Sequence, residues 1–105
     1  MFSMLYSTTD SEESAERIST DLLERRLAAC ANIIPIRSMY LWKGRIERAK
    51  EFAIILKTRK ELVDEAMTSI RRMHGYEKPC IVSYDMEKGD KDYLDWIVEE
   101  TSGAR

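Results

Sequence analysis

The chain has 105 residues, with 17 Lys and Arg against 19 Asp and Glu, which gives a net charge of −2. This length predicts a single domain, residues 1–105, with a modest core. The near-neutral balance excludes the basic surface typical of nucleic-acid-binding proteins, and no apolar run reaches the ~20 residues of a membrane span. Two cysteines do not form a disulfide scaffold, and Met1–Tyr6 does not resemble a signal peptide, so we expect a cytoplasmic protein.

The first 27 residues predict a strand followed by a helix. Phe2–Thr8 is apolar-rich and lacks chain breakers, which favours a strand. Two capping boxes can open the helix: Thr9 with Glu12, or Asp10 with Glu13. The helix is expected to end near Arg26 or Leu27. Its buried stripe is predicted from helical spacing to consist of Ala15, Ile18, Leu22 and Leu23.

The middle of the chain predicts a long β-hairpin. Its arms, Cys30–Leu41 and Ile46–Leu56, are rich in branched and aromatic residues, and Gly44 between them tolerates the positive φ of a tight turn. Pro35 cannot donate a ladder hydrogen bond, so the first arm is expected at an edge. Residues 52–56 are apolar on both faces, which indicates a central strand. One small domain cannot cover this ribbon, so we expect other copies of the chain to bury its overhang.

The second half predicts a helix, a strand and a terminal helix. A capping box, Thr58 with Glu61, is expected to open the first of these helices, and Gly75 to stop it. Pro79–Tyr84 predicts the last strand, and Asp90 an N-cap. The apolar stripe of the first helix is predicted as Leu62, Val63, Ala66, Met67, Ile70 and Met73. The residues expected to face inward from the terminal helix are Tyr93, Leu94, Ile97 and Val98.

The element order β-α-β-β-α-β plus a terminal helix predicts an α+β protein with a ferredoxin-like sandwich. We expect strand order 4-1-3-2, with strands one and three parallel at the centre and both main helices on one face. The other face is then apolar and uncovered. Self-association would cover both this face and the long edge strand.

Five segments together resemble a known family over nearly the whole chain. They are Arg26–Ile33, Ser38–Glu47, Glu51 with Lys57-Thr58, His74–Pro79, and Tyr93–Ile97. In this order and spacing they are similar to the CutA-type divalent-cation tolerance proteins. Two positions depart from the family pattern: Gly75 stands where Pro is usual, and Thr8–Asp10 replaces a segment that usually contains Pro.

The resemblance implies a ferredoxin-like protomer and a tight homotrimer with hairpins wrapped onto neighbouring subunits. It also implies a link to copper or another divalent metal ion. We expect no organic cofactor and, from the near-neutral charge, no membrane partner. The architecture is similar to that of the PII signalling trimers, which bind small ligands between subunits. In the family, the His corresponding to His74 lies in a segment that lines a cleft.

Cys30 and His74 are the metal-ligand candidates, because copper and zinc prefer thiolate and imidazole. Two ligands are too few for a closed site, so a metal would have to join adjacent subunits. Cys30 and Cys80 lie three strand spacings apart in the expected sheet, about 14 Å, which exceeds the ~7 Å limit for a disulfide. The simpler interpretation makes both cysteines buried small apolar residues and His74 a helix-end cation.

Two further groups are candidates for the intersubunit cleft. The aromatic candidates are Tyr40, Trp42, Tyr76 and Trp96, and the polar candidates are Glu51, Lys57 and Glu77. Aromatic side chains also dominate subunit interfaces, and many ion pairs have no function, so packing and surface pairing remain alternatives. Glu47, near the hairpin tip, is interpreted as a solvated or interface charge.

The sequence favours a non-catalytic, trimeric, PII-like protein over three alternatives. An acylphosphatase-like hydrolase needs an anion cradle, but no Gly-rich loop follows the first strand and Asp10 would repel an anion. An RNA-recognition module needs aromatics on the open face and basic flanks, whereas Glu51 and the net charge oppose RNA. A structural trimer that anchors partner proteins is not separated from the favoured function by sequence.

Overall fold

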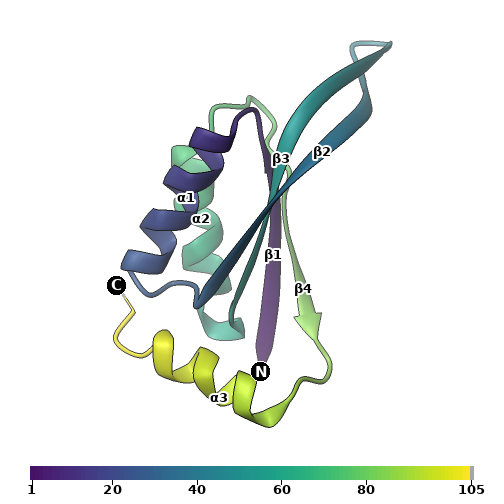
Figure 1. Ribbon diagram of the computed structural model, residues 1–105. Helices are drawn as coiled ribbons and strands as arrows, with labels where there is room; N and C mark the ends of the chain where they lie inside the picture. Colours follow the sequence, from purple (N-terminus) through teal and green to yellow (C-terminus); the bar gives the residue numbers. More distant parts are fainter. Residues whose placement is uncertain (105) are drawn as a thin grey trace.

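The computed structural model describes residues 1–104 and has a four-stranded sheet with three α-helices (Figure 1). The elements are β1 (Phe2–Thr9), α1 (Glu12–Glu24), β2 (Cys30–Trp42), β3 (Arg45–Arg59), a 3-10 turn (Lys60–Leu62), α2 (Val63–Met73), β4 (Ile81–Met86) and α3 (Lys91–Glu100). This order confirms the ferredoxin-like α+β fold with an additional C-terminal helix.

The sheet has the order β2-β3-β1-β4, which confirms the predicted strand order and places Pro35 on an edge strand. The prediction that the two central strands are parallel is wrong: β1 and β3 pair antiparallel, with Leu5 opposite Leu56. The crossover through α1 makes β1 and β2 run the same way. Because β3 returns from the hairpin and lies between them, it runs antiparallel to both.

The start and end of α1 differ from both predicted alternatives. Ser11 is the N-cap, and its Oγ accepts a hydrogen bond from the Ser14 amide at 3.1 Å. β1 continues through Thr9, whose hydroxyl donates to the Phe52 carbonyl, so Thr9 lies in the sheet and the helix begins two residues later than Thr9 would cap it. The helix ends at Glu24, because Arg26 adopts a left-handed φ of 58°, and Leu23 is exposed.

The beginning of α2 was also predicted wrongly. Thr58 lies within β3, opposite Ser3, and is fully buried, so it opens no helix. A 3-10 turn follows β3, and α2 begins at Val63 without a side-chain cap. Thr58 stays in the sheet and does not cap a helix, because residues 57–59 pair with β1.

Two C-terminal predictions also need adjustment. β4 begins at Ile81, two residues after Pro79. Asp90 caps α3 as predicted, accepting from the Tyr93 amide, but Tyr93 and Val98 are exposed rather than inward-facing.

α1 and α2 cover one face of the sheet, and the core lies between them and the sheet (Figure 1). Alternation along β1 sends Leu5 into this core, while Tyr6 points to the other face. The buried core residues are Leu5, Ala15, Ile18, Leu22, Leu27, Ala28, Ile54, Leu56, Ala66 and Ile70.

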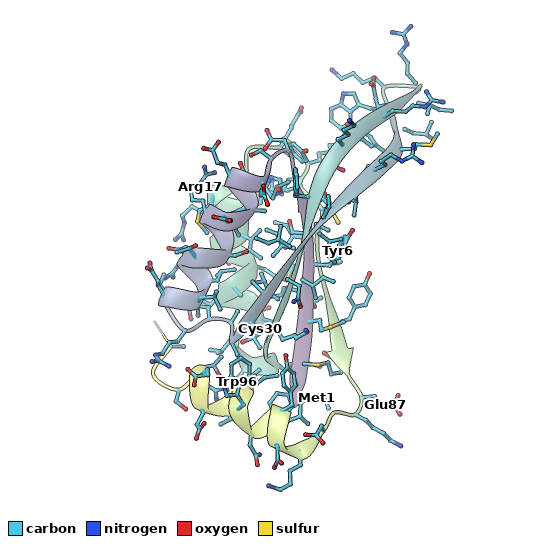
Figure 2. All side chains as sticks on the ribbon, in the orientation of Figure 1. Met1, Tyr6, Arg17, Cys30, Glu87 and Trp96 are labelled. Atoms are coloured by element: carbon cyan, nitrogen blue, oxygen red, sulfur yellow. The ribbon has the colours of Figure 1, made fainter. Side chains whose placement is uncertain are left out.

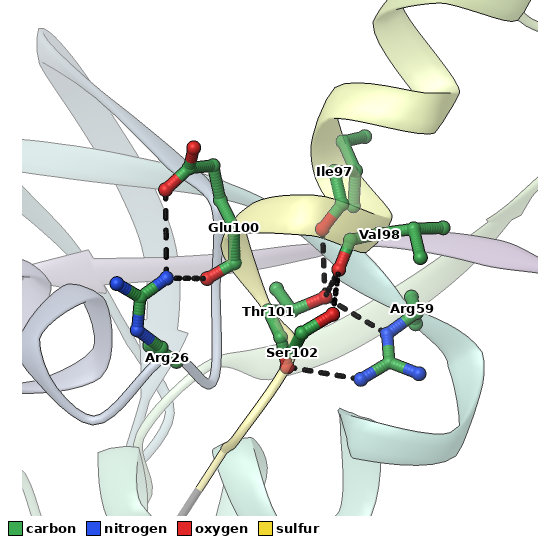
Figure 3. A network of polar contacts seen from close by, with 7 residues as sticks. All are labelled: Arg26, Arg59, Ile97, Val98, Glu100, Thr101 and Ser102. Carbon is green, nitrogen blue, oxygen red and sulfur yellow. Dashed lines mark hydrogen bonds and ion pairs between the residues drawn. The ribbon is translucent and has the colours of Figure 1, made fainter.

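α3 lies at the end of the sheet away from the hairpin tip (Figure 1). Ile97 and Thr101 are fully buried there. Arg59 donates to the Thr101 hydroxyl at 2.8 Å and to its carbonyl at 2.9 Å, and Arg26 donates to the Glu100 carbonyl (Figure 3). These contacts fix the helix end, so residues 97–101 are part of the fold.

The β2–β3 hairpin extends beyond the rest of the sheet (Figure 1). Lys43 and Gly44 form its two-residue turn, both with positive φ, as a type I′ turn requires. β1 pairs with β3 only from Phe52 onward, so Arg45–Glu51 pair with β2 alone. At about 3.3 Å per residue this overhang is about 23 Å long. The large apolar side chains exposed on it are Met39, Tyr40, Leu41 and Ile46.

Candidate ligand cleft

A cavity of about 550 Å³ lies at the base of the hairpin overhang. Its walls come from the first arm of the hairpin, Glu51 on β3, the end of β1, and the loop between α2 and β4. The lining residues are Thr8, Ser38, Met39, Tyr40, Leu41, Trp42, Glu51, Tyr76, Glu77, Lys78 and Cys80. Its size suits a small-molecule ligand.

Strand register explains why these side chains meet. Residues that pair directly share a sheet face, and Glu51 pairs with Ile36. Alternation along β2 therefore places Tyr40 and Trp42 on the Glu51 face. Thr8 pairs with Ala53, two residues from Glu51, and so belongs to this face as well. The cavity thus lies on the face that α1 and α2 leave open.

Glu51 forms the polar floor of the cavity. It is only 6% exposed, and its Oε2 accepts a hydrogen bond from the Tyr76 hydroxyl at 2.7 Å. Burial, together with this bond and charge, raises the pKa of Tyr76 well above its usual value, because ionised tyrosine would face a carboxylate. Partial removal of the thiol from water, together with the Glu51 charge, also raises the pKa of Cys80. Cys80 is exposed, contrary to its interpretation as a buried apolar residue.

Both ring nitrogens of His74 have partners within the chain. The Tyr76 amide donates to Nδ1 at 3.2 Å, so the ring proton is assigned to Nε2, which lies 2.7 Å from the Thr8 carbonyl oxygen. The His74 and Tyr76 rings are in contact, with centroids 4.9 Å apart. A metal ion could bind His74 only after one of these hydrogen bonds is released.

Cys30 lies toward the opposite end of the sheet, near α3 (Figure 2), and Lys57 is its pairing partner on β3. Lys57 donates to Asn32 Oδ1 at 2.9 Å, and its Nζ lies 6.0 Å from the Tyr93 ring centroid. The three predicted polar residues are therefore divided: Glu51 and Glu77 line the cavity, and Lys57 does not.

The aromatic candidates are divided in the same way. Tyr40, Trp42 and Tyr76 line the cavity. Trp96 lies on α3 and stacks on Tyr93, with ring centroids 5.7 Å apart, so it belongs to the other end of the molecule (Figure 2).

One protomer does not bring the predicted metal ligands together. Residues 1–104 contain no group of three His, Cys, Asp or Glu side chains arranged to hold a metal ion. Cys30 pairs with Lys57, which pairs with Met4, so it lies about four residues, or ~13 Å along the strand, from the Thr8–His74 contact. Both cysteines are free, in keeping with their predicted separation by three strand spacings.

Comparison with known proteins decides the family. Residues 3–100 match the family model described as CutA1 divalent ion tolerance protein. The chain belongs to the CutA1 divalent ion tolerance family. The divalent-cation tolerance protein CutA of Archaeoglobus fulgidus is 50% identical over 99 residues, covering 94% of this chain and 97% of that protein. The CutA of Pyrococcus horikoshii is 43% identical, covering 93% and 96%.

Solved structures of CutA1 proteins share the fold. A structure described as the periplasmic divalent cation tolerance protein CutA from Archaeoglobus fulgidus superposes with a TM-score of 0.95 at 48% identity, covering 97% of this chain and 100% of that chain. CutA1 from Oryza sativa superposes with a TM-score of 0.93 at 30% identity, covering 98% and 95%. Among residues 1–104, no helix is long and apolar enough to cross a membrane.

Sequence reasoning did not identify Thr8, Lys78 and Cys80 as cavity residues. Thr8 and Cys80 lie at adjoining strand ends on the open face, and alternation from Tyr6 and Val82 could have placed them there once the strand order was known. Lys78 comes from an irregular loop and carries no such periodic signal.

Proposed function

We propose that this protein is a non-catalytic, PII-like homotrimer in divalent-metal tolerance, with a metal ion or small ligand bound at clefts between subunits. The observation that carries the proposal is the cavity at the base of the hairpin, which combines a buried carboxylate with aromatic walls. It opens beside the apolar hairpin, so a neighbouring subunit that covers the hairpin would also close the cavity.

Exposed apolar surface supports the trimer. Leu41 is 75% exposed and Met39 64% exposed on the overhang. Val82 and Tyr84 are exposed on the open sheet face. Exposed apolar surface of this kind marks association surfaces, and an uncovered edge strand can pair with a strand of another chain.

Copper is the metal we propose, with His74 and Cys30 supplied by adjacent subunits. The separation of these residues within one protomer requires this intersubunit arrangement. Metal binding would also break one of the hydrogen bonds of His74, at Nδ1 or Nε2. We therefore expect moderate affinity, since the metal competes with an internal contact.

Calorimetric titration with copper tests the metal assignment. The wild type should bind with a fixed stoichiometry per subunit, and His74→Ala and Cys30→Ser should each weaken binding at least about tenfold. Cys80→Ser is the matched control, because its thiol lies outside the proposed ligand set. Equal copper affinity in the wild type and His74→Ala would show the ligand assignment to be wrong.

A structural trimer that anchors a partner protein is the second candidate, and the exposed Tyr84 and Val98 would suit such contacts. A hydrolase is not favoured, because Asp10 follows β1 where an anion would have to bind. We further propose a cytoplasmic location and no nucleic-acid partner. Cell fractionation tests the location, since the Archaeoglobus relative is described as periplasmic.

A further inference from the structure

Glu51 is a buried carboxylate without a cationic partner. It is 94% removed from solvent, and its hydrogen bond comes from the neutral Tyr76 hydroxyl. No ion pair within residues 1–104 includes it. Removing a carboxylate from water is costly unless a positive charge compensates it. The cavity that Glu51 lines is where such a charge could be placed.

The Glu51 charge also affects nearby ionisable groups. Burial and, after it, the Glu51 charge raise the pKa of Tyr6 and of Cys80. A carboxylate that opposes new negative charge beside the cavity favours a positive charge within it.

The walls of the cavity also suit a cation. The rings of Tyr40, Trp42 and Tyr76 line it, and aromatic faces attract ammonium groups. Trp42 already shows this behaviour, because the Lys43 ammonium lies 5.8 Å from its ring centroid. The thiol of Cys80 is poorly suited to bind a soft metal, since its thiolate form is disfavoured.

We propose that the cavity binds a small organic ammonium ion, whose N–H groups donate to the Glu51 carboxylate and whose hydrocarbon part packs between Trp42 and Tyr76. This inference rests on the proposed function, because it takes the cavity to be a ligand site, and it assigns the chemical class of the ligand. Glu77 and Lys78, which also line the cavity, are exposed and carry opposite charges. The buried Glu51 therefore decides the preferred charge of the ligand, which is positive. The rival occupant is a Lys or Arg side chain from a second copy.

The probe we choose is 2-phenylethylamine, compared with 2-phenylethanol, which has a similar shape and no charge. The chain has two tryptophans, so a Trp96→Phe background leaves Trp42 as the only tryptophan fluorophore. The full-length chain is titrated with each probe at neutral pH. We expect saturable quenching by the amine, with at least about tenfold weaker binding of the alcohol.

Three variants separate charge from shape. Glu51→Gln keeps an acceptor for Tyr76 and should weaken amine binding at least about tenfold while leaving alcohol binding unchanged. Lys78→Gln removes a like charge from the cavity wall and should strengthen amine binding a few-fold. Glu87→Gln is the matched control, because Glu87 is exposed in the turn after β4 and lies outside the cavity (Figure 2).

Equal binding of amine and alcohol, or unchanged amine binding in Glu51→Gln, would overturn the inference. No binding of the amine would also overturn it, as expected if a side chain from a second copy fills the cavity. The copper titration tests the proposed function separately. If copper binding depends on His74 but the cavity does not discriminate between amine and alcohol, only the assignment of an ammonium ligand would be refuted.

Discussion

His74 Nε2 donates a hydrogen bond to the main-chain oxygen of Thr8 at 2.7 Å, joining the end of α2 to the end of β1. The Tyr76 amide in turn donates to His74 Nδ1. These two contacts fix the loop that carries Tyr76 and bring its hydroxyl to Glu51. The single histidine of the chain is therefore a positioning residue for one wall of the cavity.

Substitution His74→Ala should lower the free energy of unfolding by about 1–3 kcal/mol, because the part-buried Thr8 carbonyl loses its donor. His74→Gln is the matched variant, since its amide N–H₂ can still donate, and it should lose less. Urea unfolding of both proteins measures the difference. Identical stability of wild type and His74→Ala would show that the His74–Thr8 hydrogen bond does not stabilise the fold.

Alkaline pH should destabilise the protein through Tyr76. Its pKa in the folded state is raised above its usual value near 10, so the folded chain keeps a proton that the unfolded chain releases. The stabilising contribution is therefore complete below pH 10 and is lost as pH rises further. In Tyr76→Phe the decline in melting temperature above pH 10 should be shallower, with a remainder due to Tyr6 and Tyr93. An unchanged slope would contradict the Glu51–Tyr76 assignment.

Truncation Trp42→Ala should destabilise the assembled protein by about 1–3 kcal/mol per protomer, because we propose that the hairpin is an interface element. Differential scanning calorimetry at fixed protein concentration measures the shift. Trp96→Ala provides a comparison at the other end of the chain, where the ring stacks on Tyr93. An unchanged melting temperature in Trp42→Ala would count against burial of the hairpin by other copies.

The α3 anchor predicts a local effect. Thr101 Oγ1 accepts from Arg59 Nε at 2.8 Å and lies 2.7 Å from the Ile97 carbonyl (Figure 3). Thr101→Val keeps the shape but deprives Arg59 of an acceptor, which should cost about 1–3 kcal/mol. Amide exchange should accelerate in α3 and much less in the β1–β3 ladder. Ser102→Ala, at an exposed hydroxyl, is the control, and equal effects of the two substitutions would refute the anchor.

Much of the fold could be predicted because its signals are local. Periodicity located the strands and helices, and Gly44 marked the hairpin turn that the structure confirms. The capping motifs failed where strand pairing competed: β1 holds Thr58 in the sheet, and Thr9 bonds to β3. The local sequence cannot show that strand pairing will displace a cap, since the paired residues are more than 40 positions apart in the chain.

The candidate site was predictable only in part for the same reason. Tyr76 and Glu51 could be named from their types, but their contact depends on how the loop after α2 crosses the sheet end. Lys57 was predicted together with Glu51 as a polar candidate for the cleft, yet six residues of extended strand separate them by about 20 Å. Distance along a strand, rather than shared strand membership, decided which residues meet.

Sedimentation velocity over a dilution series tests most directly whether other copies of the chain shelter the overhanging hairpin. We expect one species with the mass of three chains that persists on dilution, with Trp42 shielded from a water-soluble quencher. A single 12.3 kDa species at every concentration, with Trp42 open to the quencher, would contradict it.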